Sequence, residues 1–245
     1  MALLWALVGL LVGPFLNLAI YRLPRLERLL APVDCPHCHA RRPVYAQSAL
    51  LTSFQGERGR CGKCGAAPGV TEAGVELATG VAFWLLFLRF GLGPLLVLYS
   101  LYTCFLIVVF MIDWQHRLIL NRVTYPGIAL ALLLTSTVAP VGPEMTLLGV
   151  GVAGALFGGL YLLGHLLFHQ EALGLGDVKL SLLLGAMAGF PAVTWWLLLG
   201  SLFGAVGGLI MLVVRRSSLR DFMPYGTAMC LGAFVAFLLA PSSLF

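Results

Sequence analysis

The sequence predicts an all-α, polytopic membrane protein. Of its 245 residues, 60% are hydrophobic and only 10% are charged, and the mean hydropathy is +0.97. A typical soluble domain has about 25% charged residues, and an apolar run of about 20 residues is long enough to cross a bilayer as a helix. The net charge of +5 does not indicate a nucleic-acid partner, because basic residues in a membrane protein first report its orientation.

Eight apolar runs predict about eight transmembrane helices. The first run lacks the basic start and small-residue cleavage site of a signal peptide, so we expect an uncleaved helix at 1–20. A polar insert follows at 21–71, and 72–245 is predicted to form the main transmembrane bundle. The sixth run is short and ends near Gly189-Phe190-Pro191. The runs are 1–20, 73–90, 94–112, 123–139, 146–168, 178–190, 194–214 and 225–241.

The distribution of basic residues predicts which side each loop occupies. If the insert is cytoplasmic, alternation places the segments near 113–122, 169–178 and 215–224 on the same side. Of the 15 Lys and Arg residues, only Arg89 then falls on the opposite side. The positive-inside rule therefore predicts a cytoplasmic insert, with both ends of the chain outside.

Two C-x-x-C pairs in the insert predict a structural zinc site. They are Cys35-Pro36-His37-Cys38 and Cys61-Gly62-Lys63-Cys64, with 22 residues between them. This spacing is typical of a tetrahedral site with four thiolate ligands, and an insert of about 50 residues can bury little core without a metal. Two disulfides or two redox pairs are the alternatives, although the cytoplasm is reducing. His37 and His39 are alternative ligands.

Three acidic residues lie at or inside predicted membrane boundaries: Glu76, Asp113 and Asp177. A charge at the bilayer centre costs about 2.5–3.5 kcal/mol or more, so such residues are functional candidates. Asp113 and Asp177 fall at the same predicted face and could form a dyad that shares one proton. Alternatively, each caps a helix or pairs with a neighbour, Asp113 with Arg117 and Asp177 with Lys179. Glu76 is either a further site residue or a buried hydrogen-bonding group.

The segment Gly174-Leu175-Gly176-Asp177-Val178-Lys179 resembles the GxGD motif of the intramembrane aspartyl proteases. The order of motifs along nearly the whole chain resembles the bacterial type IV prepilin peptidases. In that resemblance Asp113 and Asp177 stand where the family has its two catalytic aspartates, and Gly174, Gly176 and Lys179 support the motif. Three positions depart from the family pattern. Gln115 stands in place of a frequent acid, Leu120-Asn121 in place of a Pro-Asn or Pro-Asp, and Thr227 in place of a frequent proline. The other matching segments are 13–24, the two C-x-x-C pairs, 75–80 and 224–226.

The resemblance implies an enzyme that cuts the basic leader from type IV prepilins or type II secretion pseudopilins. Such enzymes act at the cytoplasmic face of the bacterial inner membrane, and many then methylate the new N-terminus with S-adenosylmethionine. The expected cofactors are therefore structural Zn²⁺ and S-adenosylmethionine, with Glu76 as the candidate cofactor-binding residue. The expected partners are the prepilin substrates and the lipid bilayer. A membrane thiol oxidoreductase that uses the C-x-x-C pairs and a non-catalytic, zinc-bearing assembly scaffold remain alternatives.

A glycine-rich run inside the fifth apolar segment is predicted to pack helices. Residues 149–154 match the letters GxGxxG, but no strand precedes them, so they lack the context of a nucleotide-binding loop. Their spacing instead fits close helix packing by small residues. The glycines expected to act in this way are Gly154, Gly158, Gly200, Gly204 and Gly208.

Overall fold

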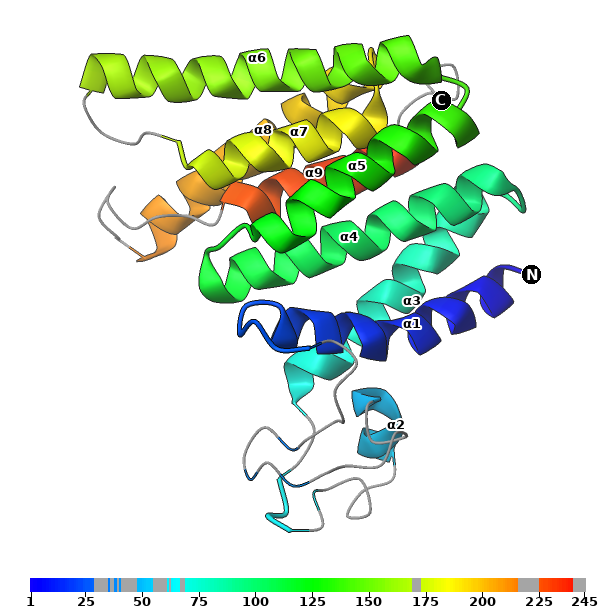
Figure 1. Ribbon diagram of the computed structural model, residues 1–245. Helices are drawn as coiled ribbons and strands as arrows, with labels where there is room; N and C mark the ends of the chain where they lie inside the picture. The colour runs from blue at the N-terminus through cyan, green and yellow to red at the C-terminus, as the bar shows by residue number, and fades with distance from the viewer. Residues whose placement is uncertain are drawn as a thin grey trace. The chain divides into compact units, whose positions relative to one another are not determined.

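In the part of the chain that the structure describes, all regular structure is α-helical (Figure 1). The structure is a computed structural model, and the described residues are 1–28, 35, 38, 40, 48–54, 61, 63–66, 69–168, 173–215 and 225–239. Their helices are α1 (Ala2–Arg22), α2 (Ala49–Phe54), α3 (Val70–Phe90), α4 (Pro94–His116), α5 (Asn121–Val138), α6 (Gly142–Phe168), α7 (Leu175–Ala188), α8 (Ala192–Arg215) and α9 (Tyr225–Leu239).

Each of the eight predicted apolar runs coincides with a helix, which confirms the all-α prediction for the described residues. Five helices are long and apolar enough to cross a membrane: α1, α3, α4, α6 and α8. By contrast, α7 and α9 have 14 and 15 residues, and α5 begins with the polar residues Asn121 and Arg122. The number of transmembrane helices therefore stays a prediction. The short helix α2 lies within the polar insert, where no helix was predicted.

The chain divides into two compact units, Met1–Leu92 and Gly93–Phe245. The structure groups α3 with α1 and α2, whereas the sequence division at residue 72 placed it with the later helices. In the first unit, α1 packs closely on α3 through two glycines. A Cβ at Gly9 would lie 2.7 Å from the carbonyl oxygen of Thr79, and one at Gly13 would lie 2.6 Å from Cα of Glu76. The absence of these side chains lets the two backbones approach.

In the second unit, buried hydroxyl groups join α4, α5 and α7. Thr135 Oγ1 on α5 donates to the carbonyl oxygen of Ala186 on α7 at 2.8 Å. Because its proton is used there, it accepts the hydrogen bond from the Tyr102 hydroxyl on α4, at 2.7 Å. Hydrogen bonds between buried hydroxyls and backbone carbonyls fix the helices that carry them. Two of these helices carry the candidate aspartates, α4 with Asp113 and α7 with Asp177.

Close packing is found at three of the five glycines predicted to act in this way: Gly154, Gly200 and Gly204. A Cβ at Gly149 would lie 2.7 Å from the carbonyl oxygen of Gly185, so α6 and α7 cross in close contact here. Gly204 similarly faces the ring of Tyr225, which a Cβ would approach to 2.6 Å. Gly158 is different, because nothing lies within 4 Å of its Cβ position.

Candidate active site

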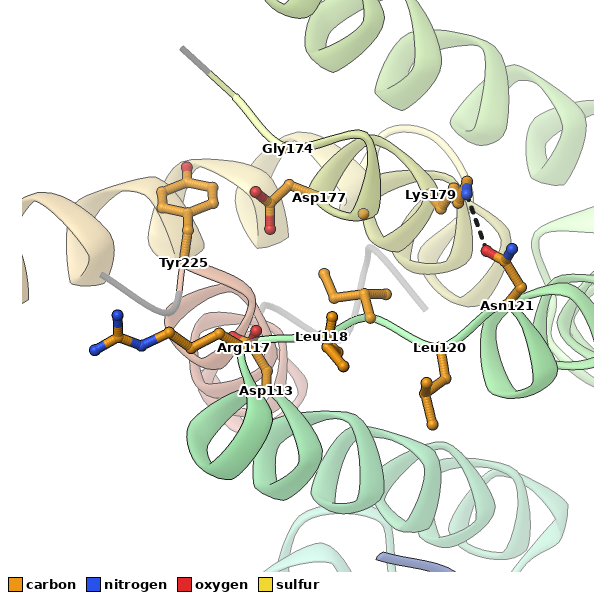
Figure 2. Close-up of a pocket in the computed structure, with 11 residues that line it drawn as sticks. Asp113, Arg117, Leu118, Leu120, Asn121, Gly174, Asp177, Lys179 and Tyr225 are labelled. Carbon is orange, nitrogen blue, oxygen red and sulfur yellow. Dashed lines mark hydrogen bonds between the residues drawn. The ribbon is translucent and has the colours of Figure 1, made fainter. Parts of the chain in front are cut away.

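Asp113 and Asp177 line one pocket of about 610 Å³ in the second unit (Figure 2). Asp113 lies in the last turn of α4, Asp177 in the first turn of α7, and Tyr225 begins α9. The loop between α4 and α5 forms another part of the wall. The full lining is Asp113, Arg117, Leu118, Ile119, Leu120, Asn121, Gly174, Gly176, Asp177, Lys179 and Tyr225. The structure therefore brings together the two carboxylates that the sequence predicted as a pair.

The carboxylate of Asp113 is held by the start of α9. The side chain is buried, with 5% of its surface exposed. Its Oδ2 accepts a hydrogen bond of 2.8 Å from the backbone N–H of Thr227. A Cβ at Gly226 would lie only 2.8 Å from the same oxygen, so the glycine permits the close approach of α9. At Arg117 the backbone turns to φ 55°, which ends α4 one turn after Asp113.

Asp177 is the third residue of α7, where a side chain can reach back toward the start of the helix. It is half-buried, and its Oδ2 lies against Gly174, where an added Cβ would be 3.3 Å away. Gly176 has a different role, because a Cβ there would lie 3.1 Å from Cβ of Ile119 in the α4–α5 loop. The GxGD glycines thus let the chain's own backbone close around the aspartate.

Lys179 points away from Asp177, toward the start of α5 (Figure 2). Its Nζ donates to Asn121 Oδ1 at 2.9 Å and lies 5.8 Å from the centre of the Tyr125 ring. Among the described residues, no ion pair joins Lys179 to Asp177 or Arg117 to Asp113. The structure thus gives no support to the neighbour-pairing alternative. The capping alternative remains open for Asp177, which stands in the first turn of α7.

Comparisons with known proteins identify the family. The model of the type IV leader peptidase family matches residues 100–209, and that of the bacterial peptidase A24 N-terminal domain matches residues 7–90. A prepilin leader peptidase/N-methyltransferase of Stutzerimonas stutzeri is 31% identical, over 94% of this chain and 88% of that protein. The chain belongs to the type IV leader peptidase family.

Other relatives carry the same printed name. The Myxococcus xanthus protein is 35% identical over 84% of this chain but only 62% of its own length. The Pseudomonas aeruginosa protein is 31% identical, over 95% of this chain and 88% of its own. No solved structure matches the chain. The N-terminal-domain match at 7–90 lies within the first compact unit, and the leader-peptidase match at 100–209 lies within the second.

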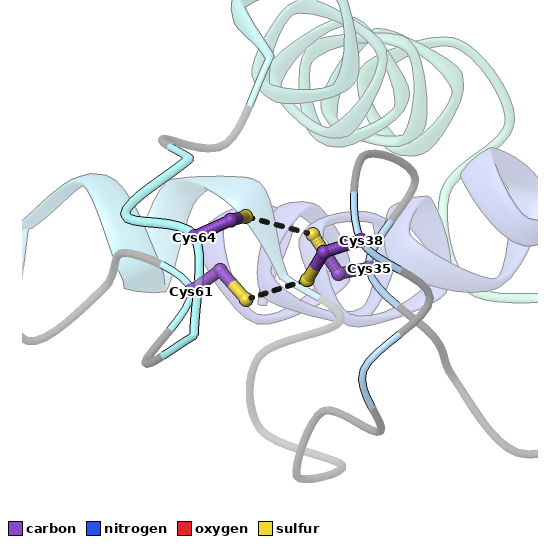
Figure 3. Close-up of side chains that lie close together, drawn as sticks. All are labelled: Cys35, Cys38, Cys61 and Cys64. Carbon is purple, nitrogen blue, oxygen red and sulfur yellow. Dashed lines mark hydrogen bonds between the residues drawn. The ribbon is translucent and has the colours of Figure 1, made fainter.

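The four cysteines of the insert converge in the first unit (Figure 3). Their sulfur atoms all lie within 4.8 Å of one another, and none is in a disulfide. Each C-x-x-C pair is followed by the same type of backbone hydrogen bond. The N–H of Cys35 donates to the carbonyl oxygen of Ala40 at 2.8 Å, and the N–H of Cys61 donates to that of Ala66 at 2.9 Å. His37 and His39 lie outside the described residues.

The sulfur geometry fits a tetrahedral metal ion. Sγ of Cys35 lies 3.6 Å from that of Cys64, and Sγ of Cys38 lies 3.6 Å from that of Cys61. Zinc–sulfur bonds of about 2.3 Å in a tetrahedron require sulfur separations of about 3.8 Å. The donor set and its spacing therefore suit zinc.

Ionisation of the thiols also favours a cation at this position. Hydrogen bonds from the backbone of Cys64 and of Lys63 lower the pKa of the Cys61 thiol to about 6. At Cys64 the backbone of Ala66 acts in the same direction, but desolvation and hydrogen bonds with the other three thiols raise the pKa to about 12. Four adjacent thiols can all lose their protons only when a cation balances the charge.

Glu76 is fully buried, and its carboxylate caps α2. Oε1 accepts from the backbone N–H of Ala49 at 2.7 Å and from Asn17 Nδ2 at 3.3 Å. Oε2 accepts from Ser48 Oγ at 2.8 Å and from the N–H of Leu50 at 3.0 Å. These bonds satisfy the first N–H groups of α2 and tie it to α1 and α3. The cofactor-binding role of Glu76 stays a prediction.

Sequence reasoning gave no role to Asn121 and Tyr225, which line the pocket, or to the N–H of Thr227, which bonds to Asp113. Asn121 follows Asp113 closely in the chain, and its polar side chain at the start of a helix is a signal that could have been used. Tyr225 entered the sequence analysis only within the matching segment 224–226. Its hydroxyl lies 3.0 Å from Ser201 Oγ, which holds the ring at the pocket wall. A backbone donor such as Thr227 has no signal in the sequence, because every residue except proline has one.

Proposed function

We propose that this chain is a multi-pass inner-membrane prepilin peptidase in which Asp113 and Asp177 activate the water that cleaves the leader peptide. The observation that carries the proposal is that two carboxylates, from the ends of α4 and α7, face one pocket in a chain of this family. A carboxylate pair is the minimum needed for aspartyl peptide hydrolysis, since one group must accept a proton while the other donates one.

These two side chains alone can supply and accept every proton that the cleavage step transfers. The ionised carboxylate takes a proton from water as the water oxygen bonds to the scissile carbonyl carbon. The protonated carboxyl gives its proton to the carbonyl oxygen. The tetrahedral intermediate then loses its C–N bond, the leaving amine takes the proton held by the first aspartate, and a hydroxyl proton returns to the second.

Membrane position supports a prepilin substrate. The basic residues that surround the pocket and the insert predict that both face the cytoplasm. A prepilin has a basic leader followed by an apolar helix, so its cleavage junction would lie at the membrane surface, at the depth predicted for Asp113 and Asp177. The exposed apolar side chains of α6, such as Leu162, Leu163 and Leu166, suit contact with lipid.

Methylation of the new N-terminus by S-adenosylmethionine is part of the proposed function, since the relatives are named prepilin leader peptidase/N-methyltransferase. From geometry we assign no residue to the methyl donor, because the four hydrogen bonds of Glu76 already engage both of its oxygens. The proposed role of the zinc ion, held by Cys35, Cys38, Cys61 and Cys64, is to fold the insert.

Cleavage of a purified type IV prepilin in liposomes tests the proposal. We expect Asp113→Asn and Asp177→Asn each to lower kcat by about a thousandfold, within the range of general acid–base contributions. Glu144→Gln is the matched control, because it makes the same change at an exposed acid of α6. A thiol oxidoreductase or an assembly scaffold would leave both aspartate variants with full function, and cleavage at wild-type rate by either variant would refute the dyad.

A further inference from the structure

The loop between α4 and α5 is fixed at both of its ends. At its start the N–H of Arg117 donates to the carbonyl oxygen of Asp113 at 2.8 Å, which closes the last turn of α4. At its end Asn121 Oδ1 accepts the hydrogen bond from Lys179 Nζ on α7, at 2.9 Å. Between these anchors the loop forms one wall of the pocket (Figure 2), and its central residue is Ile119.

The half-buried side chain of Ile119 lies against two glycines from different helices. A Cβ at Gly176 would lie 3.1 Å from Cβ of Ile119 and 3.3 Å from its Cδ1. A Cβ at Gly226 would lie 3.1 Å from the same Cδ1 and 2.8 Å from Oδ2 of Asp113. Gly176 directly precedes Asp177 in the chain. One methyl group therefore contacts both the backbone that carries one carboxylate and the backbone that lies against the other.

This contact leaves the two helix starts little freedom to adjust. Protein interiors are close-packed, so a removed methyl group leaves either a void or a movement of its neighbours. Side-chain neighbours can change rotamer, but Gly176 and Gly226 have no side chain and can respond only by a shift of backbone. Because the loop is anchored at both ends, a shift would fall on the starts of α7 and α9, which lie beside the two aspartates.

We propose that Ile119 is a positioning residue that sets the distance between the carboxylates of Asp113 and Asp177. This inference rests on the proposed dyad. Ile119 has no polar side-chain atom and takes no part in proton transfer. Its Cδ1 keeps the starts of α7 and α9 at the separation at which one water and the scissile carbonyl fit between the two acids.

Truncation of Ile119 tests the assignment. Ile119→Val removes Cδ1 alone, and Ile119→Ala removes both γ-carbons as well. Displacement of a reacting group by about 1 Å can lower a rate about a hundredfold, so we expect kcat of Ile119→Ala to fall by about this factor, with part of the loss already present in Ile119→Val. KM should not change, because the lost alignment acts on the chemical step. Ile119→Leu keeps a methyl group at the same number of bonds from Cα and should restore most of kcat.

A core deletion elsewhere in α7 separates misalignment from a general loss of stability. Leu183 is fully buried in the same helix as Asp177 and does not line the pocket. All rates are measured on prepilin in liposomes, well below the thermal transition of each variant, so that the enzyme is folded. Leu183→Ala should then lower Tm at least as much as Ile119→Ala but leave kcat at the wild-type value.

Each outcome separates this inference from the proposed function. If Asp113→Asn cleaves at wild-type rate, the dyad itself is wrong. If Asp113→Asn is inactive but Ile119→Ala keeps the wild-type kcat, the positioning role is overturned. A loss confined to KM would overturn it as well, since Ile119 would then be a contact for the substrate, and so would equal losses of kcat in Ile119→Ala and Leu183→Ala. If Ile119→Ala lacks a cooperative thermal transition, Ile119→Val and Ile119→Leu decide.

Discussion

At the residue scale, two acids are buried in the described part of the chain, and they differ in the number of hydrogen bonds that they accept. Both oxygens of Glu76 accept hydrogen bonds, four in all, whereas Asp113 accepts one and lines a pocket. A buried charge that is fully hydrogen-bonded stabilises structure, and one that is partly bonded beside a pocket is suited to proton transfer. The sequence shows that Glu76 and Asp113 are both unusually placed acids. Only their hydrogen-bond partners in the structure distinguish their roles.

Replacement of Glu76 tests its structural role. Glu76→Gln places an amide N–H₂ group among four donors, so at least one buried donor loses its acceptor at a cost of about 1–3 kcal/mol. We expect a lower Tm for the first unit by several degrees, measured on the purified protein in detergent. Glu72→Gln, an exposed change one turn away, is the control. An unchanged Tm together with weakened S-adenosylmethionine binding would instead support the cofactor role.

At the element scale, the sequence predicted the helices well because their signal is local. Apolar runs located α1 and α3–α9 without reference to any other part of the chain. The helix α2 was missed because it has six residues in a polar segment, and its cap comes from Glu76 on α3, 27 positions beyond Ala49. The bond from Thr227 to Asp113 was missed for the same reason, since a contact across 114 positions has no local pattern.

The crossing of α6 and α7 gives a test within one glycine-rich run. Gly149→Ala would put a Cβ 2.7 Å from the carbonyl oxygen of Gly185, so the helices must separate. We expect a loss of about 1–3 kcal/mol of stability, as for other overpacked sites. Gly151→Ala is the control, because nothing lies within 4 Å of its Cβ position and alanine favours a helix. Equal effects of the two changes on Tm would contradict the packing interpretation.

The two C-x-x-C pairs of the insert give a second test at this scale. We expect one zinc ion for each chain, measured by elemental analysis, and its loss in Cys61→Ser or Cys64→Ser. Removal of the metal takes away the cross-link between the two C-x-x-C pairs. Protease cleavage within 29–68 should therefore become faster, while the rate of cleavage in the helices should not change. Cys104→Ser is the control, since Cys104 lies in α4, outside the cluster. A native protein without bound metal would refute the site.

At the scale of the whole molecule, the two compact units contain different candidate sites. The first unit contains the cysteine cluster and the Glu76 cap, and the second contains both aspartates and the pocket. The sequence predicted the members of each site from residue type and motif order. It did not predict that α3 groups with the insert, because this depends on close packing at Gly9 and Gly13.

A double-mutant cycle of prepilin cleavage tests the central claim most directly. The rates needed are those of wild type, Asp113→Asn, Asp177→Asn and the variant with both changes. Residues that act as one unit give strongly non-additive losses. We predict that the double variant is no slower than either single variant, because removal of one carboxylate already abolishes proton exchange across the pair. Losses that multiply, so that the double variant is slower by the product of the two single effects, would contradict a dyad.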